Sequence, residues 1–80
     1  MAKKIHYIKS NTKFFQAVKF HKKNFELRKN DRNYQVGDTL CMEEFEKGVY
    51  TGDGTIRIVK YVLKDCPEYG LVDGYCILGF

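Results

Sequence analysis

The sequence predicts a single mainly β domain, a small and partly closed β-barrel with one early helix over one opening. Two observations support this fold class. Several short segments rich in β-branched and aromatic residues are separated by turn signals, whereas one segment near the N-terminus has helical spacing. A length of 80 residues allows one domain, residues 1–80, and contents of 44% hydrophobic and 15% aromatic residues are typical of a packed globule.

The N-terminal half predicts the order strand, helix, strand. Residues 4–9 are rich in Ile and Tyr and are predicted to form a strand. Three candidate N-caps at residues 10–12 precede residues 13–20, where apolar side chains recur at spacings of three and four, as in an amphipathic helix of about two turns. A basic turn at residues 21–23 then leads into a second strand at residues 24–29.

The C-terminal half predicts three more strands. A tight turn at residues 36–38 contains a glycine and leads into a strand at residues 39–45. Residues 46–53 are expected to be a connection, because one glycine-containing turn signal lies near its start and another at its end. Residues 55–63 are predicted to be the longest strand, and residues 75–80 a final apolar strand.

The charge is divided unevenly along the chain. Residues 1–32 contain ten Lys or Arg and two acids, a net charge of +8, whereas residues 33–80 contain four basic groups and eight acids, a net charge of −4. A segment of this kind commonly leaves a positive field on the surface, and phosphate-bearing partners are attracted to such a field. The alternative is a mixed solvated surface without a specific partner.

The remaining composition predicts a cytoplasmic protein without metal or cofactor. Three cysteines form no CxxC pair, and their odd number is typical of reduced thiols in a cytosol. No other His, Cys or carboxylate lies at ligand spacing from His6 to support a metal site. The N-terminus has no apolar signal-peptide stretch, and no apolar run approaches the ~18 residues of a membrane span. No membrane partner is therefore expected.

Residues 24–32 form the most informative stretch because they combine a short strand with a polar turn. Alternate side chains of a strand face opposite ways, so we expect Phe25 and Leu27 to face the core. Glu26 and Arg28 then share the other face, and the turn adds further amide, carboxylate and guanidinium groups. This segment is therefore predicted to present polar groups to a ligand.

The string HKKNFELR at residues 21–28, followed by VGD at residues 36–38, resembles the ASCH domains of the PUA-like superfamily. It closely resembles a branch of small bacterial and phage proteins of unassigned function, and the resemblance covers nearly the whole chain. The resemblance implies an α+β, mainly β fold, a five- to six-stranded PUA-like pseudo-barrel with one or two short helices. It also implies a cleft between the helix and the central strands, in a nucleic-acid or modified-nucleoside context. One departure is Phe20-His21, because a Gly usually precedes the two lysines.

Three residues of this motif are the first candidates for a ligand site. The guanidinium fork of Arg28 binds a phosphate or a base edge bidentately, which Lys does not reproduce. Glu26 is a candidate acceptor for an exocyclic amino group, or a general base if burial raises its pKa. The structural alternative is that Glu26 is simply a counter-ion for Arg28 or Lys23.

Four further residues complete the candidate site. Asn30 is expected to read a base edge and Arg32 to reach a phosphate, although polar turns also form for local backbone reasons. Tyr34 is nominated to stack on a base, whereas the other aromatic residues are assigned to the core. His6 is expected to border the cleft, unless it is a structural residue of the first strand.

The favoured prediction is a domain that binds RNA, or a nucleotide or modified base, in a cleft lined by Lys23, Glu26, Arg28 and Arg32. An alternative is an amidohydrolase-type enzyme acting on a modified nucleoside such as acetylated cytidine. In the ASCH-like enzymes of that kind a catalytic lysine matches Lys23, but the Thr nucleophile three residues along is replaced here by Glu26. A third possibility is an interaction module whose basic face meets an acidic protein.

Overall fold

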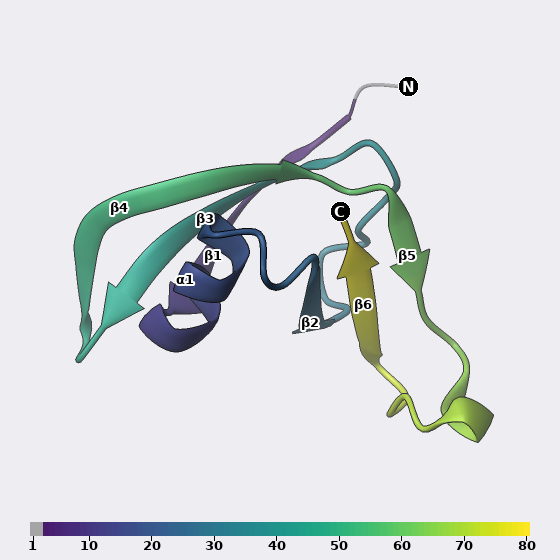
Figure 1. The fold of residues 1–80 in the computed structure, drawn as a ribbon. Coiled ribbons are helices and arrows are strands. Elements are labelled where there is room, and N and C mark those ends of the chain that lie inside the picture. Colours follow the sequence, from purple (N-terminus) through teal and green to yellow (C-terminus); the bar gives the residue numbers. More distant parts are fainter. Residues whose placement is uncertain (1–2) are drawn as a thin grey trace.

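The computed structural model describes residues 3–80 and confirms a mainly β domain with short helices (Figure 1). Within these residues the chain forms six strands, one α-helix and one 3₁₀ helix. In chain order the elements are β1 (Ile5–Asn11), α1 (Thr12–Lys19), β2 (Phe25–Lys29), β3 (Thr39–Glu46), β4 (Val49–Ile58), β5 (Tyr61–Leu63), η1 (Pro67–Tyr69) and β6 (Tyr75–Gly79).

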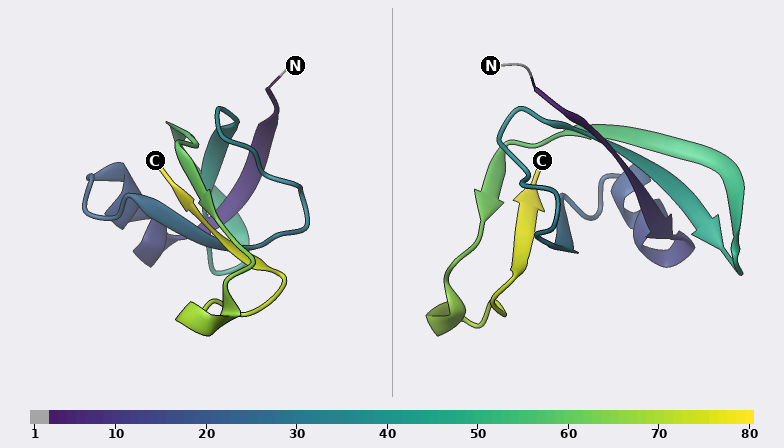
Figure 2. Two further views of the ribbon diagram at one scale, coloured as in Figure 1. Left: turned by 90° about the vertical axis from the view of Figure 1, so that its right-hand side faces the viewer. Right: turned by 180° about the vertical axis from the view of Figure 1, so that it is seen from behind.

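The strands form two three-stranded sheets. Sheet A has the order β1-β3-β4, with β1 parallel to β3 and β4 antiparallel to β3. Sheet B has the order β2-β6-β5 and is antiparallel throughout. Figure 1 and Figure 2 show the two sheets at opposite ends of the molecule, with α1 under the curve of sheet A. The helix packs against β1 and β3, so it covers the inner face of sheet A.

The first helix begins and ends at residues suited to those positions. The side chain of Asn11 caps α1 by accepting a hydrogen bond from the backbone N–H of Lys13 at 3.0 Å, as the predicted run of capping residues requires. The helix buries Phe15 and Val18 completely. It is followed by His21 at φ 60°, so this residue has the left-handed conformation that a glycine adopts more readily.

The predicted connection at residues 46–53 is partly wrong, because only the first of its two turn signals forms a turn between strands. Lys47 and Gly48 form the whole link between β3 and β4, and both have positive φ, as a two-residue type I′ hairpin turn requires. Gly52 also has positive φ but remains inside β4, opposite an irregularity in register between Glu43 and Phe45. A glycine with positive φ here produces a bulge in a strand rather than a turn.

The predicted long strand at residues 55–63 is broken into β4 and β5, which belong to different sheets. The break lies at Val59, which is buried. Its backbone N–H donates to the Asp38 carbonyl at 2.9 Å, and its carbonyl accepts from Gly37 N–H at 2.8 Å. The backbone of Val59 is therefore paired with the turn at residues 36–38, and the chain leaves sheet A at this point.

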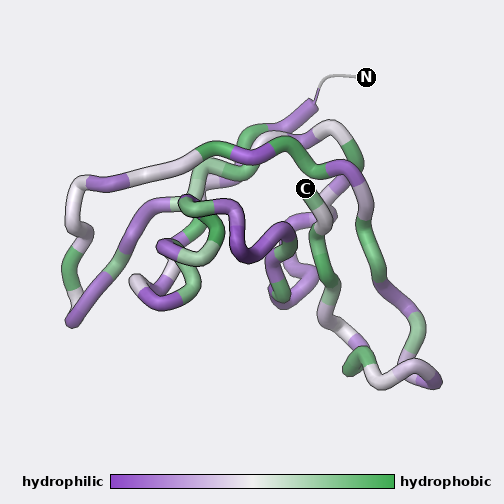
Figure 3. Tube along the Cα trace, viewed as in Figure 1, coloured by the Kyte–Doolittle hydropathy of each residue, from purple (hydrophilic) through white to green (hydrophobic). Residues whose placement is uncertain are grey.

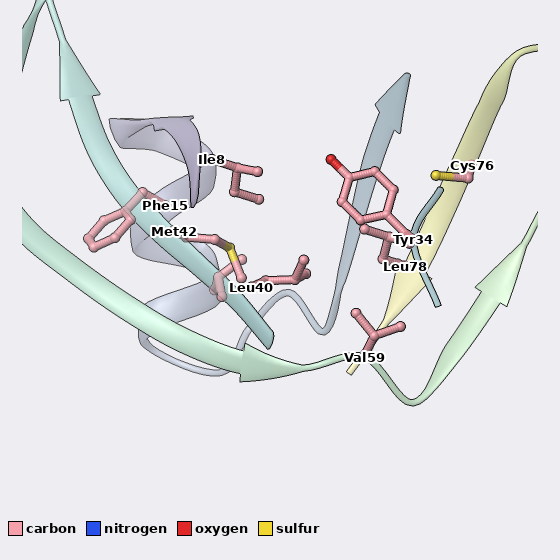
Figure 4. Close-up of a cluster of buried hydrophobic side chains, with 9 residues drawn as sticks. Ile8, Phe15, Tyr34, Leu40, Met42, Val59, Cys76 and Leu78 are labelled. Carbon is pink, nitrogen blue, oxygen red and sulfur yellow. The ribbon is translucent and has the colours of Figure 1, made fainter. Parts of the chain in front are cut away.

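The core joins the two sheets through one cluster of buried side chains (Figure 4). Sheet A and α1 contribute Ile8, Phe15, Leu40 and Met42, among others. Near sheet B the cluster contains Tyr34, Val59, Cys76 and Leu78. The thiols of Cys41, Cys66 and Cys76 are all free, and burial raises the pKa of the Cys76 thiol.

The carboxylate of Asp38 connects three segments of the chain. It is 2% exposed and accepts hydrogen bonds from His6 Nε2 at 2.8 Å, Gln35 N–H at 3.0 Å and Lys4 N–H at 3.2 Å. Burial by itself raises the pKa of Asp38, but the three hydrogen bonds outweigh it and hold the pKa below the ordinary value. The turn at residues 36–38, which contains Asp38, thereby holds the start of β1 against the loop that precedes β3.

Replacing Asp38 with Ala is expected to lower the free energy of unfolding by about 3 kcal/mol, because three donors lose their acceptor in a buried site. Urea unfolding at neutral pH measures the loss. Asp73→Ala is the matched control, since Asp73 is exposed and its loss is expected to change stability very little. Equal effects of the two substitutions would contradict this assignment.

The same carboxylate predicts a pH dependence. Because the pKa of Asp38 is lowered on folding, its contribution is present above the ordinary carboxyl pKa and is lost as the pH falls through the lowered value. The difference in free energy of unfolding between the wild type and Asp38→Asn should therefore shrink on acidification. Urea unfolding over a series of acidic pH values tests this, and a constant difference would count against it.

Candidate functional site

A pocket of about 560 Å³ is lined by residues from α1, the C-terminal end of β1 and the edge strand β2. β2 is the outer strand of sheet B, so one of its sides has no neighbouring strand among those of residues 3–80. The pocket therefore combines both sheets and the helix. Its lining residues are Lys9, Ser10 and Asn11 of β1, Phe14 of α1, Lys23 of the turn, and Phe25, Glu26, Leu27 and Arg28 of β2.

The orientation of β2 is the reverse of the one predicted from its sequence. Glu26 is buried at 5% exposure, whereas Phe25 and Leu27 are 48% and 55% exposed. Burial of the carboxylate is tolerated because both of its oxygens are paired. Oε1 accepts from Lys23 Nζ at 2.7 Å, and Oε2 accepts from Arg28 Nη1 at 3.2 Å. The inward face of this strand is thus polar, and its outward face is apolar.

The ammonium group of Lys23 lies among aromatic rings as well as beside Glu26. Its Nζ atom is 5.4 Å from the ring centre of Phe14 and 5.2 Å from that of Phe25. Both distances allow a cation–π contact, and the Lys23 side chain is only 16% exposed. Together with Lys9, the pocket therefore holds three cations and one carboxylate next to two partly exposed rings, with a net positive charge.

Two arginines cover the free edge of β1. Arg28 Nη1 donates to the Lys9 carbonyl at 3.0 Å in addition to Glu26, and Arg32 Nη1 donates to the Tyr7 carbonyl at 2.7 Å. These carbonyls are two residues apart on an edge strand of sheet A, so both point the same way. Arg28 contributes to the pocket while it also connects the two sheets. Arg32 makes the equivalent connection but does not line the pocket.

The backbone of β2 adds polar groups to the pocket. Asn24 and Asn30 flank this strand, and both are hydrogen-bonded to the β6 side, at 3.0 and 2.8 Å. In an antiparallel pair alternate residues point toward the partner, so the even-numbered residues of β2 face β6. The N–H and carbonyl groups of Phe25 and Leu27 consequently point to the open side of β2, where the pocket lies.

The other predicted site residues do not join this pocket. Tyr34 is 2% exposed, so the prediction that it stacks on a base is wrong. Its ring lies 4.6 Å from that of His6, and burial raises the pKa of its hydroxyl. His6 is buried as the partner of Asp38, which favours the structural alternative for this residue. Asn30 is half-buried, and its backbone N–H is bonded to Gly74.

Sequence reasoning missed two features of the site. Phe14 was assigned to the buried side of the helix, yet it is 51% exposed and lines the pocket. A partial signal was present, because adjacent Phe14 and Phe15 lie about 100° apart on a helix and so are not equally central to one apolar face. Ser10 also lines the pocket, and its buried Oγ atom has no hydrogen-bond partner within residues 3–80. The groups around Ser10 depend on the position of β2, so the sequence alone does not show that Ser10 lines the pocket.

Residues 5–80 match the model of a family described as a domain of unknown function, DUF3850. The chain belongs to this family. It is also 50% identical over 52 residues to an "Uncharacterized 12.9 kDa protein in GpA 3'region" of Escherichia phage P2. That match covers 65% of the chain and 48% of the relative, so this DUF3850 domain spans about half the length of the phage protein.

The described part of this DUF3850 domain shows neither a membrane-spanning helix nor a cluster of metal-ligating side chains. Over residues 3–80, none of the helices has the length and apolar character needed to cross a membrane. The same residues contain no group of three or more His, Cys, Asp or Glu side chains placed to hold a metal ion. The charged side chains that line the pocket are those of Lys9, Lys23, Glu26 and Arg28.

Glu26→Ala is expected to lower the free energy of unfolding by about 3 kcal/mol, because Lys23 and Arg28 lose a buried counter-ion. The double variant Lys23→Met/Glu26→Leu should recover at least half of that loss, since it removes the charges together. Urea unfolding of the wild type and of both variants measures this recovery. A double variant that is no more stable than Glu26→Ala would contradict the pairing.

Proposed function

We propose that this domain binds RNA, or a nucleotide or modified base, in the pocket formed by α1, β1 and β2. The observation that supports this most is the cluster of Lys23, Glu26 and Arg28, in which two cations share one buried carboxylate. The cluster has a net positive charge and lies in a pocket of about 560 Å³, a volume typical of small-molecule sites. A phosphate and a base are the groups that such a pocket suits best.

Each part of a nucleotide has a matching group in the pocket. Only Nη1 of Arg28 is hydrogen-bonded within residues 3–80, which leaves the other donors of the guanidinium for phosphate oxygens. The partly exposed rings of Phe14 and Phe25 offer stacking surfaces for a base. Glu26 acts here mainly by positioning Lys23 and Arg28, because both of its oxygens are already paired.

The edge of β2 is the element that we propose reads the base. The backbone N–H and carbonyl groups of Phe25 and Leu27 point to the open side of this strand. Every nucleobase carries donors and acceptors along its edges, and adjacent backbone groups pair with such an edge. These backbone groups would recognise a base while the charged side chains of the pocket stay in their ion pairs.

We further propose that the fold is a PUA-like pseudo-barrel of the ASCH type. The resemblance of residues 21–28 and 36–38 supports this, as does the order of one early helix between the first two strands. The left-handed His21 supports it as well, since this position precedes the two lysines and commonly holds a glycine in that family. The two sheets, connected by Arg28 and Arg32, are the walls of the proposed pseudo-barrel.

Arg28→Ala is expected to weaken binding of short single-stranded and hairpin RNAs roughly tenfold and to reduce the salt dependence, because a phosphate contact is lost. Fluorescence anisotropy at two salt concentrations measures both effects. Arg32→Ala is the matched control, since it removes the same kind of contact with β1 outside the pocket. Equal affinity of wild type and Arg28→Ala for every RNA and nucleotide tested would contradict this site.

A second function has one specific observation in its favour. Lys23 Nζ lies 2.7 Å from Glu26 Oε1 inside the pocket, which is the geometry that an acid–base pair needs. Hydrolysis of an acylated nucleoside would use Glu26 to deprotonate water and Lys23 to protonate the departing amine. Because residue 26 is Glu rather than the Thr nucleophile of those enzymes, this proposal uses direct attack by water.

If this enzyme hypothesis is correct, N4-acetylcytidine is converted to cytidine and acetate, and Lys23→Ala abolishes turnover while the protein remains folded. Chromatography of the nucleosides measures the reaction, and circular dichroism checks the fold. Lys22→Ala is the control, because Lys22 is exposed and does not line this pocket. No turnover across a broad panel of acylated nucleosides would leave binding as the function of the pocket.

A further inference from the structure

Sheet B has an apolar outer face in addition to its buried inner face. The register places Phe25, Gly79 and Tyr61 in one row across β2, β6 and β5. Phe25 is 48% and Tyr61 is 63% exposed, and Figure 3 shows hydrophobic segments along β5 and β6. The remaining apolar members of this face are Leu27, Leu63, Tyr75 and Ile77.

Gly79 leaves a gap between the two aromatic residues of this row. Neighbouring strands are about 4.8 Å apart, so the Cα atoms of Phe25 and Tyr61 lie roughly 10 Å from each other with no side chain between them. A Cβ atom built on Gly79 would lie 3.5 Å from the Cβ of Tyr61, an ordinary contact on the same face. Other residues would therefore fit at position 79, and their side chains would fill the space between Phe25 and Tyr61. We call this space the Gly79 gap.

The charge around sheet B is asymmetric along the strands. Lys60 directly precedes Tyr61 and is exposed, and its backbone N–H donates to the Gly79 carbonyl at 2.7 Å, so this lysine follows the row closely in the chain. Lys23 lies over the ring of Phe25 on the other side. The opposite end, residues 64–74, connects β5 to β6 and contains three acids and one lysine (Figure 1). A polyanion is therefore attracted to the row that contains Gly79.

The Gly79 gap adjoins the pocket because Phe25 borders both. Phe25 and Leu27 line the pocket while their side chains also belong to the outer face of sheet B. The distance from Gly79 to the edge of β2 is one strand spacing, about 4.8 Å. A chain that leaves the pocket across β2 thus reaches the Gly79 gap within a single nucleotide.

We propose that the Gly79 gap takes one base of a single-stranded nucleic acid whose adjacent nucleotide occupies the pocket. The base stacks between Phe25 and Tyr61, and Lys60 and Lys23 contact the phosphates on either side. This inference rests on the proposed function of the pocket and makes it more specific. The ligand is a strand of at least two nucleotides rather than a free nucleotide.

The test fills the gap without removing any charge. Gly79→Val places a β-branched side chain in a strand, which the backbone accommodates. Thr39→Val is the matched control on sheet A, where Thr39 lies between Ile5 and Ile58. The affinities of wild type and both variants are measured for uridine monophosphate and for a labelled oligouridine of four nucleotides. Thermal unfolding checks that each variant is folded, and Tyr61→Leu serves as a second variant if Gly79→Val is not.

The wild type and Thr39→Val are expected to bind the oligonucleotide at least tenfold more tightly than the mononucleotide, because one more base is stacked. Gly79→Val should lose most of this ratio while its affinity for the mononucleotide stays within about twofold of wild type. If both ligands bind equally and Arg28→Ala weakens both roughly tenfold, the pocket is correct and the Gly79 gap is not a base site. Binding of neither ligand overturns the proposed function and this inference together. If sedimentation shows that the wild type is a dimer and Gly79→Val a monomer, the outer face of sheet B serves self-association. That result would overturn this inference but not the proposed function of the pocket.

Discussion

The carboxylate of Glu26 is buried between two cations, and the direction in which β2 faces follows from this interaction. A strand of five residues has only two faces, so an inward Glu26 requires that Phe25 and Leu27 point outward. The inward face then supplies the charged groups of the pocket, and the outward face supplies the apolar surface of sheet B. Had the hydrophobic face turned inward, neither feature would exist. A single paired charge thus shapes both surfaces that we propose for ligand binding.

The same charges also hold the two sheets together, which links stability to function. Arg28 contacts Glu26 within its own strand and the Lys9 carbonyl in sheet A, and Arg32 makes a parallel contact with Tyr7. A ligand phosphate that recruits Arg28 therefore acts on a residue that bridges two sheets. The remaining donors of its guanidinium allow both contacts at once, which a lysine at this position could not provide. Matched substitutions at Arg28 and Arg32 separate the two roles because only one of these residues lines the pocket.

Local patterns predicted the elements whose conformation is decided by neighbours in sequence. The capping run before α1, the VGD turn and the Lys47–Gly48 turn were all placed correctly, since each depends on a few adjacent residues. The break at Val59 was not predicted, because an apolar β-branched residue continues a strand on local grounds. What ends the strand is pairing of Val59 with a turn about twenty residues earlier in the chain. Tyr34 was misplaced for a related reason: a polar loop does not reveal that one of its side chains enters the core.

The sequence by itself determined a mainly β domain with one early helix, a basic N-terminal half, and the grouping of Lys23, Glu26 and Arg28. These three residues are neighbours because spacings of two and three bring side chains together in a strand and the turn before it. Only the tertiary structure decided which face of β2 is buried and that Phe14 and Ser10 complete the pocket. Alternation along a strand separates two faces, but it does not say which of them meets the core. That choice depends on whether the buried carboxylate is paired, and here Lys23 and Arg28 pair it.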